Sequence, residues 1–201
     1  MHVSYGVEQF RRLPNAVVTS GTFDGVHLGH QKILTRLREV AAATGGASVV
    51  ITYFPHPRMV VSADSQDLKL LSTLDEKIEL LARQGVDHLL IIPFTRDFSL
   101  LTSEEFIQKI LIETIGTKTL VIGYDHRFGR NREGSFEYLT ANADRYGFRI
   151  EEIPRQDLEH VGISSTQIRA ALLAGRVRQA AQFLGREYTL TGMVVKGRQL
   201  G

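Results

Sequence analysis

Two histidines in a glycine-rich turn are the residues of this sequence best suited to bind an anion. His27 and His30 belong to the segment Gly-Thr-Phe-Asp-Gly-Val-His-Leu-Gly-His, which covers residues 21–30. The segment joins an apolar run at 16–20 to a helical pattern at 28–44, so both histidines fall at or near a helix N-terminus. Free N–H groups and the helix dipole make that position an anion site, and two imidazoles on one helix face add donors for a phosphate. The spacing matches neither Gly-x-Gly-x-x-Gly nor Walker A, which excludes those two phosphate-binding loops.

A second segment, at 163–169, places three consecutive hydroxyls before an amphipathic helix in the sequence Ile-Ser-Ser-Thr-Gln-Ile-Arg. One hydroxyl is needed to cap the helix, so two remain for a ligand. Arg169 lies about one turn into the helix, where its guanidinium can return to the N-terminus and hold a phosphate. A capped surface helix with a solvated arginine explains the segment equally well when it is taken alone.

Two further segments follow expected strands. Residues 53–57, Tyr-Phe-Pro-His-Pro, combine aromatic rings, two prolines and an imidazole, which suits a flat apolar ligand. Residues 123–134 contain three arginines, two acids and three glycines, which suits a mobile loop that contacts phosphate. A proline-rich connector and a solvated polar loop are the respective alternatives.

Regular structure must position these segments, and the hydrophobic periodicity predicts alternating strands and helices. The expected strands cover 16–20, 47–53, 88–93, 117–122 and 148–153, and the expected helices cover 28–44, 74–84, 103–114, 135–146, 166–174 and 177–184. Residues 54–57 are expected to form a loop, because two prolines cannot both sit in a central strand. The alternation indicates an α/β fold with a doubly wound, mostly parallel sheet, in which ligands bind beyond the carboxyl ends of strands where the strand order reverses.

The end of the sequence departs from this pattern. Residues 188–195 read as one more strand, and a glycine-containing turn follows at 196–201. A strand without a partner is not stable by itself. We therefore expect residues 1–187 to form one domain and 188–201 to be a short β stub, the first strand of a further β domain. Fraying, or pairing at a sheet edge, is the alternative.

The composition excludes several classes of protein. The chain has 201 residues, with 24 Lys plus Arg, 22 Asp plus Glu and 43% hydrophobic residues, as in an ordinary globular protein. The absence of cysteine excludes disulfides, cysteine-ligated zinc and thiol nucleophiles. No apolar run approaches the roughly 20 residues of a membrane helix, and the N-terminus resembles no targeting peptide, so we expect a cytoplasmic protein without a membrane partner. The basic residues form no aromatic-interleaved stripe, so no nucleic-acid partner is expected.

Together the four segments resemble the nucleotidyltransferases with a His-x-Gly-His signature, and specifically the FMN adenylyltransferase module of bacterial bifunctional riboflavin kinase/FAD synthetases. Residues 21–30 are similar to the first ATP motif of that family and residues 163–169 to its second. Residues 54–57 and 123–134 are similar to its flavin-side and nucleotide-side loops. Residues 192–197 resemble the opening strand of the kinase barrel, whose Pro-Thr-Ala-Asn segment would follow residue 201. The sequence departs from the family at position 126, which is His where the family often shows Phe.

The resemblance implies a Rossmann-like fold and transfer of an adenylyl group from ATP to FMN, with Mg²⁺, to give FAD and pyrophosphate. The FMN phosphate is already anionic and can attack the α-phosphorus without a general base, so such an enzyme needs mainly positioning and charge neutralisation. The implied catalytic residues are His27, His30 and Arg169. Those implied to bind ATP are Gly21, Thr22, Phe23, Asp24, Gly25, His27, Gly29, His30, Asp125, Arg127, Ile163, Ser164, Ser165, Thr166 and Arg169. Those implied to bind the flavin are Phe54, Pro55, His56, Pro57 and Phe128.

The resemblance also implies that residues 1–187 are the FMN adenylyltransferase domain and 188–201 the first strand of a riboflavin kinase β-barrel, the C-terminal partner domain of a longer parent protein. No kinase activity is expected from this chain, and the metal ligands and the oligomeric state stay unassigned. Asp24 is expected to hold the glycine turn or a ribose rather than to abstract a proton. Two alternatives stay open: a transferase with a phosphopantetheine or nicotinate nucleotide acceptor, and a module that binds nucleotide or flavin without turnover.

Overall fold

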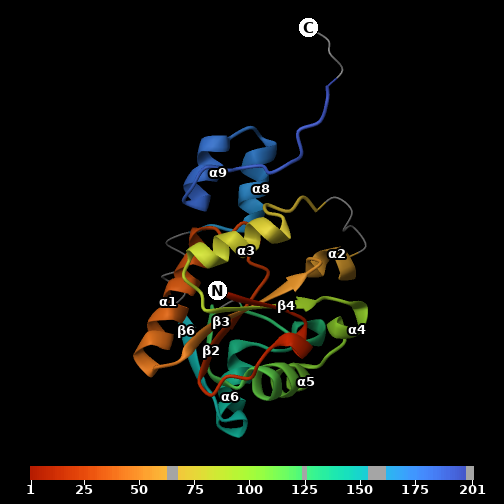
Figure 1. Ribbon diagram of the computed structural model, residues 1–201. Coiled ribbons are helices and arrows are strands. Elements are labelled where there is room, and N and C mark those ends of the chain that lie inside the picture. The colour runs from red at the N-terminus through yellow and green to blue at the C-terminus, as the bar shows by residue number, and fades with distance from the viewer. Residues whose placement is uncertain (63–67, 124–125, 154–161, 198–201) are drawn as a thin grey trace.

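The computed structural model describes residues 1–62, 68–123, 126–153 and 162–197 (Figure 1). Within these ranges, six strands form one sheet in the order β1-β4-β3-β2-β5-β6, and every neighbouring pair is parallel. The strands are β1 (His2–Tyr5), β2 (Ala16–Ser20), β3 (Ala47–Phe54), β4 (His88–Pro93), β5 (Thr117–Gly123) and β6 (Arg149–Ile153). The predicted parallel sheet is thus confirmed, and the reversal of strand order places β2 between β3 and β5.

Helices cover both faces of this sheet. They are α1 (Leu28–Thr44), α2 (Pro57–Val61), α3 (Leu74–Arg83), α4 (Arg96–Ser99), α5 (Ser103–Glu105), the π-helix η3 (Phe106–Ile115), α6 (Phe136–Tyr146), α8 (Ser165–Leu173) and α9 (Val177–Leu184), with short 3₁₀ turns η1 (Val7–Gln9) and η4 (Arg130–Arg132). Helix α3 begins with a capping box, because the Thr73 side chain accepts from the backbone of Glu76 and the Glu76 side chain accepts from the backbone of Thr73.

Alternate residues of the central strands pack on opposite faces of the sheet, as the period of two in a strand requires. Val17 joins the core formed with α1 and α3, whereas its neighbour Val18 joins the core formed with η3 and α6. Both residues are fully buried. A strand that is apolar on both faces explains why the predicted run at 16–20 is continuously buried rather than alternating.

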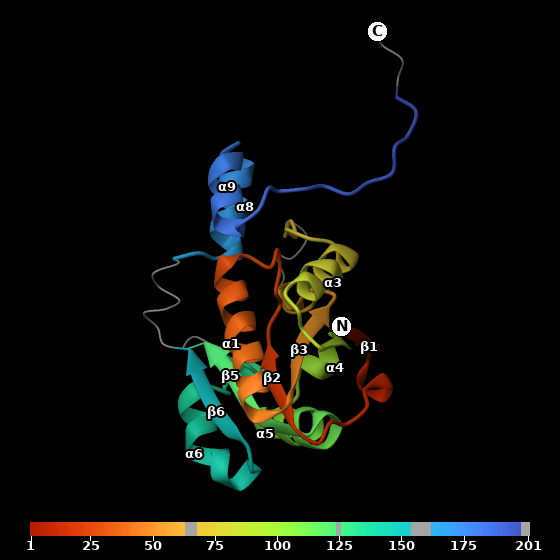
Figure 2. The same cartoon turned by 60° about the vertical axis from the view of Figure 1, so that its left-hand side comes forward.

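The helices α8 and α9 form a third apolar cluster, which includes Ile168 and Leu184 and packs on Leu71. In Figure 2 this pair stands over the N-terminal end of α1, and the side-chain amide of Gln31 in α1 donates to the carbonyl of Leu184 at 3.0 Å. The pair therefore brings residues 163–169 to the end of α1 that carries the two histidines.

Three details differ from the sequence-based prediction. Residues 188–195 form no strand: the chain leads away from α9, and its large apolar side chains at 190 and 193–195 are exposed (Figures 1 and 2). Residues 54–57 are not all loop, because β3 continues to Phe54 and Pro57 begins α2, a position where its missing N–H costs nothing. The edge strand β1 was not predicted, because four residues are too few to show a period.

Candidate active site

A cavity of about 1240 Å³ opens at the carboxyl ends of β2 and β5, where the strand order reverses. Its walls come from the turn before α1, the end of β3 with α2, residues 94–106, residues 126–131 and the start of α8. Pockets for one small ligand have volumes of roughly 300–1,000 Å³. This cavity therefore has room for two ligands side by side.

The two histidines of the first motif are stacked on each other in this cavity. His27 is the N-cap of α1, and its Nδ1 accepts from the backbone N–H of His30 at 3.3 Å. The ring centroids lie 3.7 Å apart, with 17° between the planes. Gly29 makes the stack possible, since a Cβ at this position would lie 3.2 Å from Nδ1 of His27 and 3.6 Å from the carbonyl oxygen of Ile163.

Both imidazoles are neutral near pH 7. Burial lowers the pKa of His27 to about 4, with Asp24 opposing the shift and two arginines adding to it. Burial also lowers the pKa of His30 well below its ordinary value, and His27 and Lys77 lower it further. Because Nδ1 of His27 accepts a hydrogen bond, the proton of the neutral ring is on Nε2. The pair therefore offers neutral hydrogen-bond donors rather than positive charge to a ligand.

His30 has an unusual atom for a neutral imidazole. Its Nδ1 is buried and makes no hydrogen bond within the part of the chain that the structure describes. An unpaired buried polar atom costs about 1–3 kcal/mol. Such an atom beside a cavity is typical of a site that a ligand completes.

The backbone around the histidines is strained. Phe23 and Val26 have φ angles of 47° and 38°, which non-glycine residues rarely adopt. Gly25 between them has a φ of 77°, and a Cβ there would lie 2.9 Å from the side chain of Leu71. Strain of this kind costs roughly 1–3 kcal/mol per residue and concentrates at functional sites.

Asp24 and Arg169 connect the two motifs beneath the cavity floor. The Asp24 carboxylate accepts from the backbone N–H groups of Leu71 at 2.9 Å and Ser72 at 3.3 Å, and its second oxygen pairs with the Arg169 guanidinium at 2.5 Å. Arg169 also donates to the carbonyl of Lys69 at 2.7 Å. The guanidinium is therefore held by Asp24 and Lys69 and does not return to the N-terminus of its own helix. Arg169 still lines the cavity.

The three hydroxyls of the second motif have different partners. Ser164 caps α8 and forms a capping box with Gln167. Ser165 donates to the carbonyl of Asp24 at 3.1 Å, so its hydroxyl joins α8 to the turn that contains Asp24. Thr166 is exposed at the cavity wall and is free to face a ligand. One surplus hydroxyl therefore remains, rather than the two that capping alone predicted.

The structure divides the predicted ATP-binding residues into two groups. Phe23, Asp24 and Gly25 do not line the cavity but are buried behind it. Asp125 lies outside the described residues. The cavity is lined by Gly21, Thr22, His27, Gly29, His30, Arg127, Ile163, Ser164, Ser165, Thr166 and Arg169.

The predicted flavin-binding residues divide in the same way. Phe54 is 47% exposed and, like Pro55, lies outside the cavity wall. His56 and Pro57 line the cavity, and burial lowers the pKa of His56 to about 4. Phe128 lines it from inside the core, with its ring centroid 5.4 Å from that of Phe106.

Much of the aromatic and basic wall of the cavity was not predicted from the sequence. Phe94 and Phe98 pack against Tyr53 at centroid distances of 5.6 and 6.0 Å and line the cavity with it. Arg58 and Arg96 add two basic side chains to the same wall. These residues stand in no recognisable motif, and only their position directly after β3 and β4 signalled them. His126, whose role the sequence left open, lines the wall with its Nε2 3.4 Å from the Ser20 hydroxyl.

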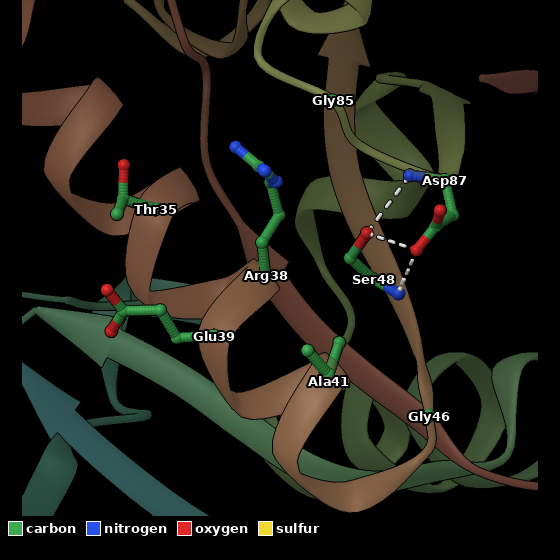
Figure 3. A pocket seen from close by; sticks show the side chains of 9 residues that line it. Thr35, Arg38, Glu39, Ala41, Gly46, Ser48, Gly85 and Asp87 are labelled. Carbon is green, nitrogen blue, oxygen red and sulfur yellow. Dashed lines mark hydrogen bonds between the residues drawn. The ribbon is translucent and has the colours of Figure 1, made fainter.

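A second cavity, of about 500 Å³, lies at the opposite end of the sheet (Figure 3). It is bounded by the C-terminal half of α1 and the starts of β3 and β4. Its most buried polar groups satisfy each other, because Asp87 accepts from the backbone N–H of Ser48 at 2.9 Å and from its hydroxyl at 2.6 Å (Figure 3). The described residues that line it include no histidine and no aromatic side chain.

The described residues contain no group of three or more His, Cys, Asp or Glu that could hold a metal ion. None of their helices combines the length and the apolar character that crossing a membrane requires.

Comparison with known proteins identifies the family of this chain. The family model for FAD synthetase matches residues 9–167. The bifunctional riboflavin kinase/FMN adenylyltransferase of Listeria monocytogenes is 35% identical over 187 residues, 93% of this chain and 59% of that protein. The protein of the same name from Escherichia coli K12 is 35% identical over 203 residues, 100% of this chain and 64% of that protein. The chain thus spans about three-fifths of the length of these relatives.

A solved structure agrees with the fold. The crystal structure titled macrolide-efflux protein from Streptococcus pneumoniae has a TM-score of 0.78 and 26% identity, and the match covers 92% of this chain and 70% of that one. The matched family segment contains the stacked histidines, the aromatic wall and the start of α8. The chain belongs to the FAD synthetase family.

Proposed function

We propose that this chain transfers the adenylyl group of ATP to FMN and releases FAD and pyrophosphate. The names of its relatives include this activity. The observation that carries the proposal is a single cavity with two different halves. One half presents the stacked His27 and His30 with the start of α8, and the other presents Tyr53, Phe94 and Phe98.

The two halves suit the two substrates. Helix N-termini and imidazole N–H groups bind phosphate oxygens, so the triphosphate of ATP belongs beside α1. Aromatic side chains bind flat rings, so the isoalloxazine of FMN belongs beside Phe98. The FMN phosphate then lies between the two halves, next to the α-phosphorus of ATP.

The reaction forms a bond from an FMN phosphate oxygen to the α-phosphorus and breaks the bond from that phosphorus to the bridging oxygen of pyrophosphate. No proton has to be removed from the nucleophile, because the FMN phosphate is anionic at neutral pH. Negative charge grows on the leaving pyrophosphate. In the proposed complex, His27 donates from Nε2 and Arg169 donates from the N–H groups that Asp24 and Lys69 leave free, and the rigid stack keeps these donors in place.

We infer that Mg²⁺ enters with ATP. The described cavity wall holds no carboxylate cluster, and Asp24 is already engaged. Mg²⁺ is commonly held mostly by substrate phosphates and water. When bound, the ion neutralises charge on the phosphates.

We also infer that a riboflavin kinase domain follows this module in the parent protein. The relatives are named as bifunctional, and this chain covers about three-fifths of their length. Residues 188–197 leave α9 without forming a strand, with exposed apolar side chains such as Leu190 and Val194. These side chains would be buried if the segment completed a sheet elsewhere.

The test is incubation of the chain with FMN, ATP and Mg²⁺, followed by chromatography for FAD and a coupled assay for pyrophosphate. Equal amounts of FAD and pyrophosphate are expected. Pyrophosphate release with a phosphopantetheine or nicotinate nucleotide acceptor, but not with FMN, would replace the proposed acceptor. Binding of FMN and ATP without release of pyrophosphate would reduce the chain to a binding module.

A further inference from the structure

Ser20 and His126 form a polar contact in the cavity that the proposed reaction does not use. Ser20 is the last residue of β2, and its hydroxyl oxygen lies 3.4 Å from Nε2 of His126. Both side chains line the cavity, although Ser20 is only 7% exposed. The backbone N–H of His126 donates to the carbonyl of Gly123 at 3.0 Å, and its ring centroid lies 5.8 Å from that of Phe128. The contact therefore connects the end of β2 to the chain that follows β5.

This contact belongs to the aromatic half of the cavity. Side chains alternate along a strand, so Ser20 points to the same face of the sheet as Val18, which packs in the core with η3 and α6. Tyr53 of β3 packs against the same core. The stacked histidines lie on the other face, since the ring centroid of His30 lies 5.0 Å from that of Phe23 in the core with α1. The contact therefore faces the ring-binding side of the cavity rather than the phosphate side.

Three side chains in this half can both donate and accept hydrogen bonds. They are the Ser20 hydroxyl, the His126 imidazole and the hydroxyl of Tyr53, which lines the cavity from the neighbouring strand β3. Burial raises the pKa of Tyr53 to about 12, against the effect of the Ser20 hydroxyl, so Tyr53 keeps its proton near pH 7. The arginines of the same wall, Arg58 and Arg96, can only donate. The aromatic half thus contains a small polar group among its rings.

An isoalloxazine ring has two different edges that such a group can distinguish. The pyrimidine edge carries an N–H donor between two carbonyl acceptors, whereas the opposite edge carries two methyl groups. The faces of the ring stack on aromatic side chains in either direction, so the aromatic wall does not choose between the edges. Side chains that both donate and accept match the alternating pattern of the pyrimidine edge.

We infer that Ser20 and His126 are specificity residues that bind the pyrimidine edge of the flavin and so determine which way the ring enters the cavity. A methyl edge in the same place would offer these side chains no hydrogen bond. A site built to hydrogen-bond its ligand discriminates strongly against an analogue that lacks the matching group. This inference rests on the proposed binding of FMN and adds the direction of its ring.

The experiment replaces His126 with phenylalanine, which keeps an aromatic ring against Phe128 but removes both nitrogens. Dissociation constants are measured without ATP, by quenching of flavin fluorescence, for FMN and for FMN methylated at N3 of the pyrimidine edge. We expect His126→Phe to weaken FMN by about tenfold and N3-methyl FMN by less than about threefold, because methylation has already removed the same hydrogen bond. His126→Asn, which keeps a donor and an acceptor, should recover part of the FMN affinity.

Two controls separate binding of the ring edge from a general effect on the structure. The affinity for ATP, measured by calorimetry, should stay within about twofold in His126→Phe, because the phosphate half lies on the other face of the sheet. His2→Phe is the same substitution at an exposed position and should leave both flavin affinities unchanged.

Three results for His126→Phe would overturn the inference: an FMN affinity within about twofold of the wild type, an equal loss for both flavins, or an equal loss for ATP. The binding measurements need no turnover, so they separate this inference from the proposed reaction. A chain that shows the expected difference but makes no FAD would support the inference and contradict the reaction. Formation of FAD with an unchanged FMN affinity in His126→Phe would do the reverse.

Should His126→Phe fail to fold, the wild-type chain decides the question. N3-methyl FMN must then bind about tenfold or more weakly than FMN. FMN with an ethyl group in place of the methyl at position 8, on the opposite edge, must keep its affinity within about threefold. Equal losses for the two analogues, or the opposite order, would overturn the inference.

Discussion

The carboxylate of Asp24 and the guanidinium of Arg169 form a buried ion pair between residues 145 positions apart in the sequence. The side chains are 2% and 13% exposed. Through Asp24 the pair is joined to the loop before α3, and through Arg169 it is joined to α8. The two motifs are thus parts of one rigid floor beneath the histidine stack.

Removing the charge of Asp24 should destabilise the protein. Asp24→Asn keeps an oxygen that can accept from Leu71 and Ser72 but leaves the Arg169 guanidinium without its counter-charge. Breaking a buried pair from one side costs about 3–5 kcal/mol, and we expect a value near the lower end because Arg169 keeps some exposure. Urea denaturation measures the loss.

The matched control is the exposed ion pair between Arg36 and Glu151, whose atoms are also 2.5 Å apart. Arg36→Gln should cost less than about 1 kcal/mol. An equally small loss for Asp24→Asn would show that burial adds nothing to the pair.

Loss of the Arg169 guanidinium should weaken the interaction with ATP. Arg169→Met should raise the KM for ATP and slow turnover. An unchanged KM would contradict a contact between Arg169 and ATP.

Loss of the His30 imidazole should impair the chemical step. His30→Ala removes one half of the stack and one donor at the phosphate half of the cavity. Removal of one such donor lowers kcat by about 10²-fold in other enzymes, and we expect a similar loss of FAD formation here. The exposed His2 provides the control, since His2→Ala should leave kcat unchanged. A kcat for His30→Ala within a factor of about three of wild type would remove His30 from the mechanism.

Acid should destabilise the ligand-free protein through its buried histidines. The pKa values of His27 and His56 are about 4 in the folded state, below the ordinary 6.5. Between these values the unfolded chain binds more protons than the folded one, so stability is present above pH 6.5 and is lost as the pH falls towards 4. Each histidine should contribute about 2 kcal/mol to the loss between pH 7 and 5.

Denaturation curves at pH 7 and pH 5 check this expectation. His56→Gln should reduce the loss of stability between the two pH values, because the variant has one fewer buried group to protonate. His2→Gln, at an exposed position, should not change it. A wild-type protein equally stable at both pH values would contradict the assignment of neutral buried imidazoles.

Gly29 should be required for the stacked pair. In the first turn of a helix, alanine is intrinsically more favourable than glycine by up to about 1 kcal/mol. At this position, however, the added Cβ would lie 3.2 Å from Nδ1 of His27 and displace that ring. We therefore expect Gly29→Ala to lower kcat severalfold with little loss of melting temperature. Gly192→Ala, where nothing lies within 4 Å of the added carbon, is the control.

The aromatic half of the cavity should determine the affinity for the flavin. Phe98 contacts both Tyr53 and Phe94, and it lines the cavity. Loss of such a ring removes roughly 1 kcal/mol or more of contact, so Phe98→Leu should raise the KM for FMN by about fivefold or more. The KM for ATP should stay unchanged. Equal changes in both KM values would show that the Phe98 ring supports the structure of the whole cavity and does not act on the flavin alone.

Much of this protein is determined by local patterns in its sequence. The strand at 16–20 and the helices at 28–44 and 177–184 have in the structure the bounds that their periodicity and capping residues predict. The position of the cavity also followed from the sequence, because alternating strands and helices form parallel sheets whose ligands bind where the order reverses. His27 and His30 were recognisable because glycines and a helix start surround them.

The roles of individual polar groups depended on the tertiary structure. The sequence placed Arg169 near a phosphate, but it could not show that Asp24, 145 residues away, anchors the guanidinium. It did not reveal the neutral state of the histidines, because their pKa values reflect burial by residues from other elements. Lys77 looked like an ordinary helix residue until the packing of α3 buried it. Local sequence determines which elements form, whereas charge, burial and hydrogen-bond partners belong to residues that only the folded chain brings together.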